Sequence, residues 1–339
     1  MVASTSDEPP AAPERPPIAG FWRRLAAFVV DALVLAVPAT LLGFAMVRWA
    51  SSLGEAGRLI GFVVALLYFG LLNSRLGGGQ TLGKRLLGIR VTDRAGAPLS
   101  PLRASLRYLV LAVPYFLNGL WFDLEVTWAH PLNQLFALLL ALVVFGGGGA
   151  FVYLLLFNRR TRQLPDDLVV GSFVVRGRAA ALPARLATAR LHLIVVGCWL
   201  VLVLGLGVIG PWVIGGGGTA ESLKPLVEIQ AAVRAQLGTR LVGVNKNTTT
   251  HGGGSTTTSL SVTARLDDWP GDADAVITRI AGVVLELHPD LLGSQVLAVR
   301  LFRGFDFGIA SWSWTYVGSL DAAGWRAKLA HAPAAARKT

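Results

Sequence analysis

Long apolar stretches alternate with polar stretches along most of the chain. A helix needs about 20 apolar residues to cross the hydrocarbon core of a bilayer, and it satisfies its backbone hydrogen bonds internally. Five stretches approach that length, and they are residues 25–47, 59–75, 106–122, 131–157 and 191–214. The third is the weakest, because it is short and contains Pro114 and Asn118. The pattern predicts an α-helical membrane bundle with about five transmembrane helices.

The positions of Lys and Arg predict how these helices are oriented. Residues 75–107 hold seven Lys and Arg against one acid, and residues 159–190 hold seven Arg against two acids. The connector 123–130 has two acids and no Lys or Arg. Short loops rich in Lys and Arg stay in the cytoplasm, so we expect both basic loops there and the connector outside. An even number of crossings then separates the basic loops, which requires the third stretch to span the membrane and places the N-terminus in the cytosol.

Composition agrees with this membrane reading. The chain of 339 residues is 53% hydrophobic and 15% charged, and its mean hydropathy of +0.56 is too apolar for an ordinary soluble domain. The net charge of +11 comes from Lys and Arg that flank apolar runs, so we expect a lipid bilayer and no nucleic acid as the partner. The lone Cys198 excludes an internal disulfide.

The composition shifts divide the chain into five segments. Residues 1–19 are rich in Pro, Ala and Glu without apolar periodicity, and we expect a disordered cytosolic tail. Residues 20–178 form a membrane domain with four spans. Residues 179–218 supply a basic linker, the fifth span and a Gly linker at 215–218. Residues 219–332 form an extracytoplasmic domain, and 333–339 are a tail.

The C-terminal domain shows two repeats of one rhythm. Apolar residues recur at helical spacing in 226–237 and alternate as in a half-buried strand in 260–266. A second amphipathic stretch, 276–287, precedes strand-like residues 294–303 and 305–317 around a glycine. These two helix-hairpin units predict a two-layer α+β domain, with both helices on one face of a four-stranded antiparallel sheet.

Two features of this domain leave alternatives open. Trp312, Trp314 and Tyr316 alternate onto one sheet face, where we expect them in the core and keep a binding surface as the alternative. Residues 245–258 form a Thr- and Gly-rich hairpin loop, which we interpret as a solvated tip more than as a partner contact.

Asp31 is the costliest residue in the first apolar stretch. An ionised carboxylate costs about 2.5 to 3.5 kcal/mol at the centre of a membrane helix, and less near the end where Asp31 lies. Partners on neighbouring helices would lower that cost, and the polar candidates are Tyr68, Asn73, Arg107 and Asn118. Asp31 either locks helix packing through a polar contact or binds a cation or relays a proton. Gly146–Gly149 in the fourth stretch favour close packing over a flexible break.

Three segments together resemble the RDD family of membrane proteins. They are Gly20-Phe-Trp-Arg-Arg-Leu-Ala-Ala-Phe-Val-Val-Asp31, the segment 79–91 that reads GQTLGKRLLGIRV, and the segment 156–171 that reads LFNRRTRQLPDDLVVG. The resemblance covers residues 18–178. It implies a multi-pass bundle, and a few members of the family are associated with sodium or potassium to proton exchange.

The family is named for one Arg and two Asp. Arg24 and Asp31 correspond to the Arg and the first Asp. Asp167 fits the second, because Leu-x-x-Gly follows it, whereas Pro165 and Asp166 replace the more usual Leu-His. The resemblance therefore implies a polar centre of Arg24, Asp31 and Asp167.

The segment Gly78–Lys84 imitates the start of a phosphate-binding loop. Arg85 occupies the position of the magnesium-binding hydroxyl, and the segment follows a membrane helix instead of a strand, so we reject nucleotide binding. We expect Lys84, Arg85 and Arg90 to form a basic loop that attracts anionic lipid at about 1 kcal/mol each.

No other motif predicts catalysis. The five His are dispersed and cannot build a metal site with one Cys, and no nucleophile motif is present. We expect no metal, no cofactor and no enzymatic activity. The leading interpretation is a multi-pass protein of the cytoplasmic membrane that takes part in transport of cations, protons or a small solute. The alternative is a non-transporting anchor or envelope assembly protein, in which residues 219–332 bind an envelope protein or a second copy.

Overall fold

The computed structural model describes residues 17–118, 131–177, 181–183, 186–214, 219–239, 241–250, 256–268, 270–289 and 296–331. The chain divides into two compact units. The first unit contains Met1–Leu33, Leu66–Leu111 and Gly149–Gly197. The second contains Val34–Ala65, Ala112–Gly148 and Cys198–Thr339. The sequence predictions for the tails 1–16 and 333–339, the connector 123–130 and the Gly linker 215–218 lie outside the described residues, as do residues 251–255 of the predicted loop 245–258. The prediction is wrong for the rest of that loop, because residues 245–250 and 256–258 are strand.

Long apolar helices occupy the predicted membrane stretches. They are α1 (Phe21–Ala45), α3 (Gly57–Leu72), α5 (Pro101–Leu117), α7 (Pro131–Ala141) running through a π-helical segment into α8 (Gly148–Phe157), and α10 (Arg190–Ile214), with the short α2 (Val47–Ser52) after α1. Within the described residues, four candidate spans are long and apolar enough to cross a membrane: Phe21–Ala45, Gly54–Leu72, Leu132–Phe157 and Arg190–Ile209. Helix α5 is described over 17 residues, so its crossing stays a prediction.

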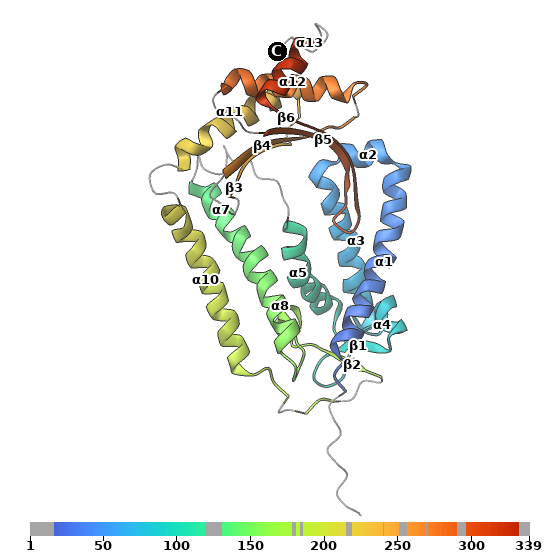
Figure 1. The fold of residues 1–339 in the computed structure, drawn as a ribbon. Helices are drawn as coiled ribbons and strands as arrows, with labels where there is room; N and C mark the ends of the chain where they lie inside the picture. The colour runs from blue at the N-terminus through green and yellow to red at the C-terminus, as the bar shows by residue number, and fades with distance from the viewer. Residues whose placement is uncertain are drawn as a thin grey trace, which may run out of the picture. The chain divides into compact units, whose positions relative to one another are not determined.

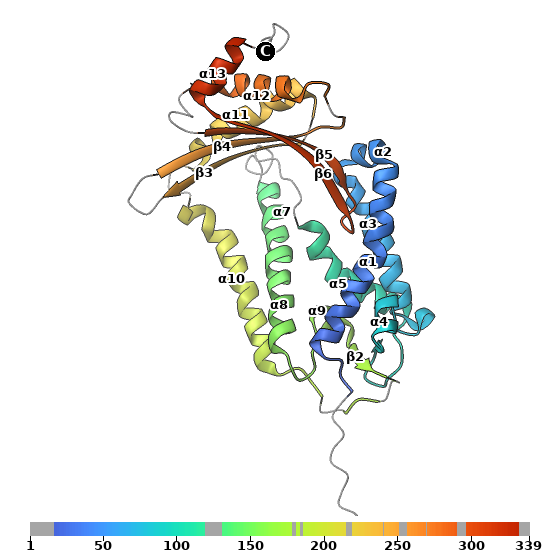
Figure 2. The same cartoon turned by 45° about the vertical axis from the view of Figure 1, so that its right-hand side comes forward.

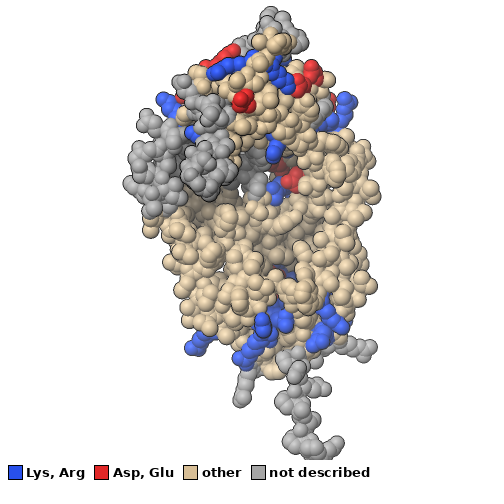
Figure 3. Space-filling model, in the orientation of Figure 1, with Lys and Arg blue, Asp and Glu red and all other residues tan. Residues whose placement is uncertain are grey.

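These helices leave many large apolar side chains exposed. Leu33, Leu41, Leu67 and Val201 are each more than half exposed in the isolated chain. On the face shown in Figure 3, uncharged side chains cover the helical part, and Lys and Arg gather at one end of it. Apolar exposure of this extent is what a bilayer would cover.

A small sheet organises the first unit. Strand β1 (Ile89–Thr92) pairs antiparallel with β2 (Phe173–Arg176), and Ile18 forms a bridge to Val175 on β2. Ile18 and Ala19 are buried. The expectation of a disordered tail up to residue 19 is therefore wrong for residues 17–19, which pair with a strand that lies far away in the sequence.

Two short helices flank this sheet. Helix α4 (Leu82–Leu86) begins at Thr81, whose hydroxyl accepts the amide of Lys84. Helix α9 (Pro165–Val170) begins with a proline at its first position, where no amide partner is needed. It ends at Gly171, whose φ of 63° is a left-handed conformation that favours glycine.

The π-helical segment Leu142–Gly147 lies in the second unit. A π-turn leaves carbonyls without their usual helical partners. The indole N–H of Trp199 on α10 lies 3.3 Å from the carbonyl of Phe145 and 3.2 Å from that of Gly146. Gly146 also faces the side chain of Leu200. Gly146 thus packs against α10, and Gly147 lies against Pro114 of α5, whereas nothing lies within 4 Å of a Cβ built at Gly148.

The C-terminal domain belongs to the second unit and has two layers (Figure 1). Its elements are α11 (Thr219–Leu237), β3 (Val242–Thr250), β4 (Thr256–Arg265), α12 (Ala273–Leu287), β5 (Val296–Asp306), β6 (Ser311–Asp321) and α13 (Ala322–His331). The strand order is β3-β4-β5-β6. Figure 2 shows all three helices on one face of the sheet. Both helix-hairpin units are present as predicted.

The expectation of a fully antiparallel sheet is wrong. Strands β3 and β4 pair antiparallel, as do β5 and β6, but β4 and β5 pair parallel. The reason is α12, which carries the chain from the end of β4 back to the starting side before β5 begins. A helical crossover of this kind makes the joined strands parallel.

Two further expectations for β5 and β6 are corrected. Strand β5 runs through Gly304 to Asp306, and the turn lies at 307–310 with Gly308 at a φ of 73°. Trp312, Trp314 and Tyr316 are 49%, 41% and 37% exposed, so they are not core residues. All three lie on the edge strand β6, and the rings of Trp312 and Trp314 contact Phe44 on α1.

The domain core lies between the helices and the sheet. Its fully buried members include Ile229, Val233, Leu260, Val262, Ile280, Val284, Leu297, Val299 and Trp325. The indole of Trp325 on α13 also donates to the carbonyl of Leu297 at 2.9 Å.

Trp325→Ala should destabilise the C-terminal domain by about 3 to 5 kcal/mol, because it removes the largest buried side chain and leaves a cavity. Limited proteolysis of the full chain in a urea series measures the effect. Trp314→Ala, which truncates an exposed indole in the same domain, should lower the cleavage midpoint far less. Equal midpoints for the two variants would contradict this core.

Candidate functional site

Asp31 is the buried carboxylate of α1. It is 1% exposed and belongs to the first unit. Tyr68 donates its hydroxyl to Asp31 Oδ1 at 2.7 Å, Thr81 donates to Oδ2 at 2.5 Å, and the amide of Gly83 donates to Oδ1 at 2.7 Å. Among the described residues, no Lys or Arg forms an ion pair with it. Three neutral donors therefore hold a buried carboxylate.

The segment Gly79–Lys84 supplies most of this cage. Gly83 approaches the carbonyl of Ala27 so closely that no Cβ would fit, which lets α4 cross α1 beside Asp31. The sequence named Tyr68 among the possible partners but missed Thr81 and Gly83. Their signal was the glycine-rich segment itself, which resembles a phosphate loop but binds a carboxylate of its own chain.

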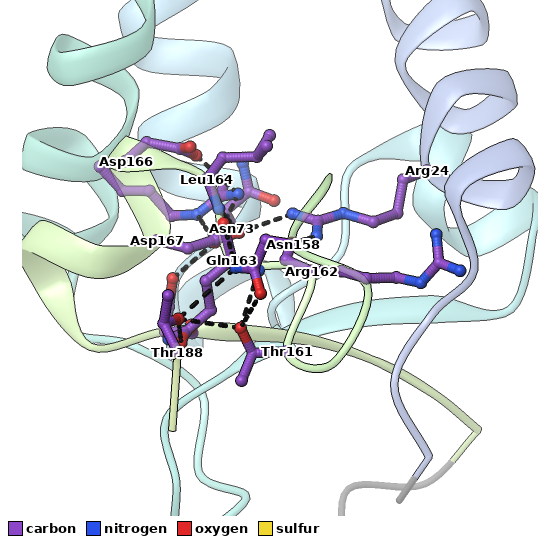
Figure 4. Close-up of polar contacts among 12 residues, drawn as sticks. Arg24, Asn73, Asn158, Thr161, Arg162, Gln163, Leu164, Asp166, Asp167 and Thr188 are labelled. Atoms are coloured by element: carbon purple, nitrogen blue, oxygen red, sulfur yellow. Dashed lines mark hydrogen bonds and ion pairs between the residues drawn. The ribbon is translucent and has the colours of Figure 1, made fainter. Parts of the chain in front are cut away.

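Asp167 on α9 is held in a different way. It is fully buried and accepts a charged hydrogen bond from Arg24 Nη2 at 2.6 Å. Arg107 Nε donates to it at 2.9 Å, and Ser172 donates its hydroxyl at 2.8 Å. Figure 4 shows Arg24 and Asp167 pointing toward one another from different segments. The structure thus brings these two predicted residues together, and Asp31 has a separate set of partners.

Asp166 and Asp167 share Arg107 but differ in acidity. Arg107 Nη2 lies 2.8 Å from Asp166 Oδ2, whereas Asp166 Oδ1 is buried without a partner among the described residues. Burial raises the pKa of Asp166 to about 6, and Arg107 opposes that rise. Burial alone would raise the pKa of Asp167 as well, but Arg107 and Arg24 hold it well below its usual range. Asp167 is therefore the permanently ionised member.

An uncharged network supports the loop before α9 (Figure 4). Asn158 donates to the carbonyl of Gln163 at 2.9 Å, and Gln163 donates to the carbonyl of Ser172 at 2.9 Å. Thr161 donates to Asn158 Oδ1 at 3.0 Å, and Thr188 donates to Gln163 Oε1 at 3.1 Å. These bonds hold the loop that precedes Asp166 and Asp167, and thereby help to position the two aspartates. The sequence reasoning missed this network, because each member is an ordinary polar residue.

Lys84 turns toward the bundle. It is half-buried, its ammonium donates to Asn73 Oδ1 at 2.8 Å, and it lies 5.9 Å from the centre of the Phe69 ring. Burial lowers the pKa of Lys84 to about 7, and Arg107 adds to the lowering, whereas Asp31 opposes it. This lysine can therefore change its charge near neutral pH, which sequence reasoning did not anticipate.

The other two residues of the predicted lipid-contacting loop face differently. Arg85 is exposed and donates to the carbonyl of Gly77 at 3.2 Å. Arg90 on β1 is half-buried, and its Nε has no partner among the described residues. Their contact with anionic lipid stays a prediction.

The first unit thus contains one buried carboxylate held by neutral donors and one held by two arginines. Residues 18–171 match the model of the RDD family. The match ends after α9, so α10 and the C-terminal domain lie outside it.

Two relatives in Bacillus subtilis (strain 168) are similar to part of the chain. One carries the name uncharacterized protein YckC and is 24% identical over 156 residues, which cover 46% of this chain and 83% of that protein. The other, uncharacterized protein YxaI, is 28% identical over 125 residues, which cover 31% of this chain and 80% of that protein. No solved structure matches the chain.

Asp167→Asn should destabilise the protein by about 3 to 5 kcal/mol, because it leaves Arg24 without its counter-charge and leaves Arg107 with Asp166 alone. The thermal unfolding midpoint of the purified full chain in detergent reports this loss. Asp93→Asn, at a half-exposed turn of the same unit, is the matched control and should change the midpoint little. A midpoint for Asp167→Asn within the range of that control would contradict the arginine lock.

Proposed function

We propose that this RDD family membrane protein moves a proton or another small cation across the membrane, and that it does so without enzymatic activity. Asp31 is the residue on which the proposal rests. Among the described residues, this carboxylate is 1% exposed, accepts hydrogen bonds from neutral donors and forms no ion pair. Such a group gains most from a proton or a metal cation.

The contrast with Asp167 assigns the two carboxylates different roles. Asp167 contacts Arg24 and Arg107, so its charge is already balanced and a cation has little to gain there. We therefore assign Asp167 to holding the fold of the polar end. The transported ion would exchange at Asp31.

Lys84 supports the same proposal. Its pKa of about 7 includes an upward contribution from Asp31, so the charges of the two groups are coupled. A lysine of this kind can accept and release a proton near neutral pH.

The proposal includes a topology. We infer five crossings of the cytoplasmic membrane, with the N-terminus in the cytosol and residues 219–332 outside. Four candidate spans and the excess of Arg and Lys in the loops 75–107 and 159–190 support it. In this topology the polar end of the bundle faces the cytosol.

The alternative is a non-transporting anchor or envelope assembly protein. One observation favours it: the C-terminal domain has its own buried core and presents exposed aromatic rings on β6. Such a domain could bind an envelope protein or a second copy, while the bundle only holds it at the membrane.

Asp31→Asn should abolish cation-dependent proton flux in vesicles that contain the purified full chain, because an amide cannot take up or release a proton in this range. Tyr68→Phe is the matched variant, since it removes one donor to the same carboxylate and leaves Asp31 ionisable. We expect it to retain a measurable flux. A pH-sensitive dye inside the vesicles follows both reactions at equal protein insertion.

Equal flux for wild type and Asp31→Asn would exclude transport through this residue. Loss of flux in both variants together with a lower unfolding midpoint would instead assign Asp31 to structure alone. No flux from the wild type under any cation gradient would favour the anchor.

Single-cysteine labelling tests the topology. Cys198→Ser gives a background without cysteine, into which Ala95→Cys or Glu286→Cys is introduced at exposed positions. A membrane-impermeant maleimide should label Glu286→Cys in cells with an intact cytoplasmic membrane, and Ala95→Cys only after lysis. Labelling of both variants, or of neither, before lysis would place the two segments on one side.

A further inference from the structure

The turn of the β5–β6 hairpin, residues 305–310, packs on membrane helices of the second unit. Gly57 and Gly61 of α3 lie one helical turn apart and approach the carbonyls of Asp306 and Phe307 so closely that a side chain at either position would collide. Gly43 of α1 meets the ring of Phe305 in the same way. Small residues at this spacing permit close backbone approach within membranes. Here they seat a β-turn.

Hydrogen bonds hold the turn in this position. The hydroxyl of Tyr115 donates to the carbonyl of Gly308 at 2.8 Å, and the amide of Gly308 donates to Asp306 Oδ1 at 2.7 Å. Arg265 Nη2 donates to the carbonyl of Ser51 at 2.9 Å and to that of Gly304 at 3.1 Å. The hairpin is therefore held in place against α1 and α3, and two cavities lie along it.

One cavity is lined mainly by apolar side chains. It has a volume of about 310 Å³ and is formed by α1, α3 and the turn, with Ala39, Leu42, Val64, Phe307 and Ile309 among its walls. The residues that line it from α1 and α3 all belong to candidate spans, and Trp49 of α2 also lines it. Hydrocarbon is the material that surrounds these spans in a bilayer, so a hydrocarbon chain is the occupant that suits this cavity.

A second cavity, of about 440 Å³, lies along the same hairpin and has both polar and apolar walls. Its walls include Arg265, Asp306, Ser311, Trp312 and Ser313. Arg265 is only 6% exposed, yet its Nε has no partner among the described residues. A buried guanidinium donor without an acceptor is costly, and the planar donor fork of arginine matches a phosphate.

Asp306 does not supply the missing acceptor. Its Oδ1 already accepts the amide of Gly308, and its Oδ2 lies 3.8 Å from Arg58 Nη1. The hydroxyls of Ser311 and Ser313 offer further bonds to phosphate oxygens, and Trp312 is typical of the membrane interface. Among the described residues, Arg265 forms no ion pair, so its positive charge can attract a phosphate in this cavity.

We propose that the β5–β6 hairpin and helices α1 and α3 bind one amphiphile, with its hydrocarbon chain in the apolar cavity and its phosphate at Arg265. Asp306 and Phe307 are consecutive residues, and they line the second and the first cavity respectively. The chemistry of a long apolar chain joined to a phosphate fits a phospholipid and a polyprenyl phosphate equally. The site lies on residues that the RDD family match does not contain, apart from α1 and α3.

Photocrosslinking tests the site in the full chain reconstituted into lipid nanodiscs. The probe is phosphatidylglycerol with a diazirine in one acyl chain, and diacylglycerol with the same chain serves as the probe without phosphate. We expect peptide adducts at residues 34–42, 60–64 and 307–309. The phosphate-bearing probe should give about tenfold more adduct there, as expected for one charge-assisted hydrogen bond.

Matched variants separate binding from misfolding. Ile309→Trp fills the apolar cavity, and Val317→Trp adds the same bulk at an exposed position of β6. Arg265→Lys changes the phosphate ligand, and Arg300→Lys changes an exposed arginine of β5. Adduct at the three segments should fall in Ile309→Trp and Arg265→Lys and persist in Val317→Trp and Arg300→Lys, with C-terminal domain stability measured by proteolysis unchanged.

Unlabelled competitors assign the source of the ligand. Displacement of the probe mainly by phosphatidylglycerol assigns the site to a membrane phospholipid, and displacement mainly by polyprenyl phosphate assigns it to a lipid carrier. The proposal is overturned by adducts spread evenly over all helices, by equal yields from the two probes, or by failure of both competitors. Unchanged adduct in both Ile309→Trp and Arg265→Lys would overturn it as well.

Discussion

The cost of burying charge is the constraint on which the polar end of this bundle depends. A carboxylate in a low-dielectric environment must be paired with a cation, hydrogen-bonded, or neutralised by a proton. The chain uses the first solution at Asp167, between Arg24 and Arg107, and the second at Asp31, within a cage of neutral donors. The first leaves a locked joint between distant segments. The second leaves Asp31 without an ion pair among the described residues, so Asp31 would gain more than Asp167 from binding a cation.

Glycine permits a close backbone approach in each of the two units, for one physical reason. At Gly83 the missing side chain lets α4 lie against α1 and point a backbone amide at Asp31. At Gly57 and Gly61 the missing side chains let backbone carbonyls of the β5–β6 turn reach α3. Close backbone approach replaces side-chain packing in each case. The bundle thereby holds a carboxylate in its first unit and a β-hairpin in its second without long polar side chains along the helices.

Periodicity and charge in the sequence predicted the elements whose burial is regular. The apolar stretches gave four candidate spans, and the 3.6-residue and two-residue rhythms gave α11, α12 and the strands of the C-terminal domain. Pairing between segments that lie far apart in the sequence cannot be inferred from local periodicity. The parallel β4–β5 pair, the bridge of Ile18 to Val175 and the bond of Thr81 to Asp31 all depend on which segments meet. Trp312 and Trp314 were misplaced because alternation identifies a strand face but does not tell whether a helix covers it.

The boundary of the family match separates two kinds of chemistry. Residues 18–171 contain both aspartates, both arginines and the caging segment, so the charge-handling site is complete within the shared domain. Arg265 and the β5–β6 hairpin lie beyond it, yet they pack on helices that the shared domain supplies. In the proposed site the C-terminal domain therefore supplies Arg265, the group that would bind the phosphate, and the bundle supplies the apolar wall. Since neither part alone has both groups, recognition of an amphiphile would be a property of this combination of domains and not of the family.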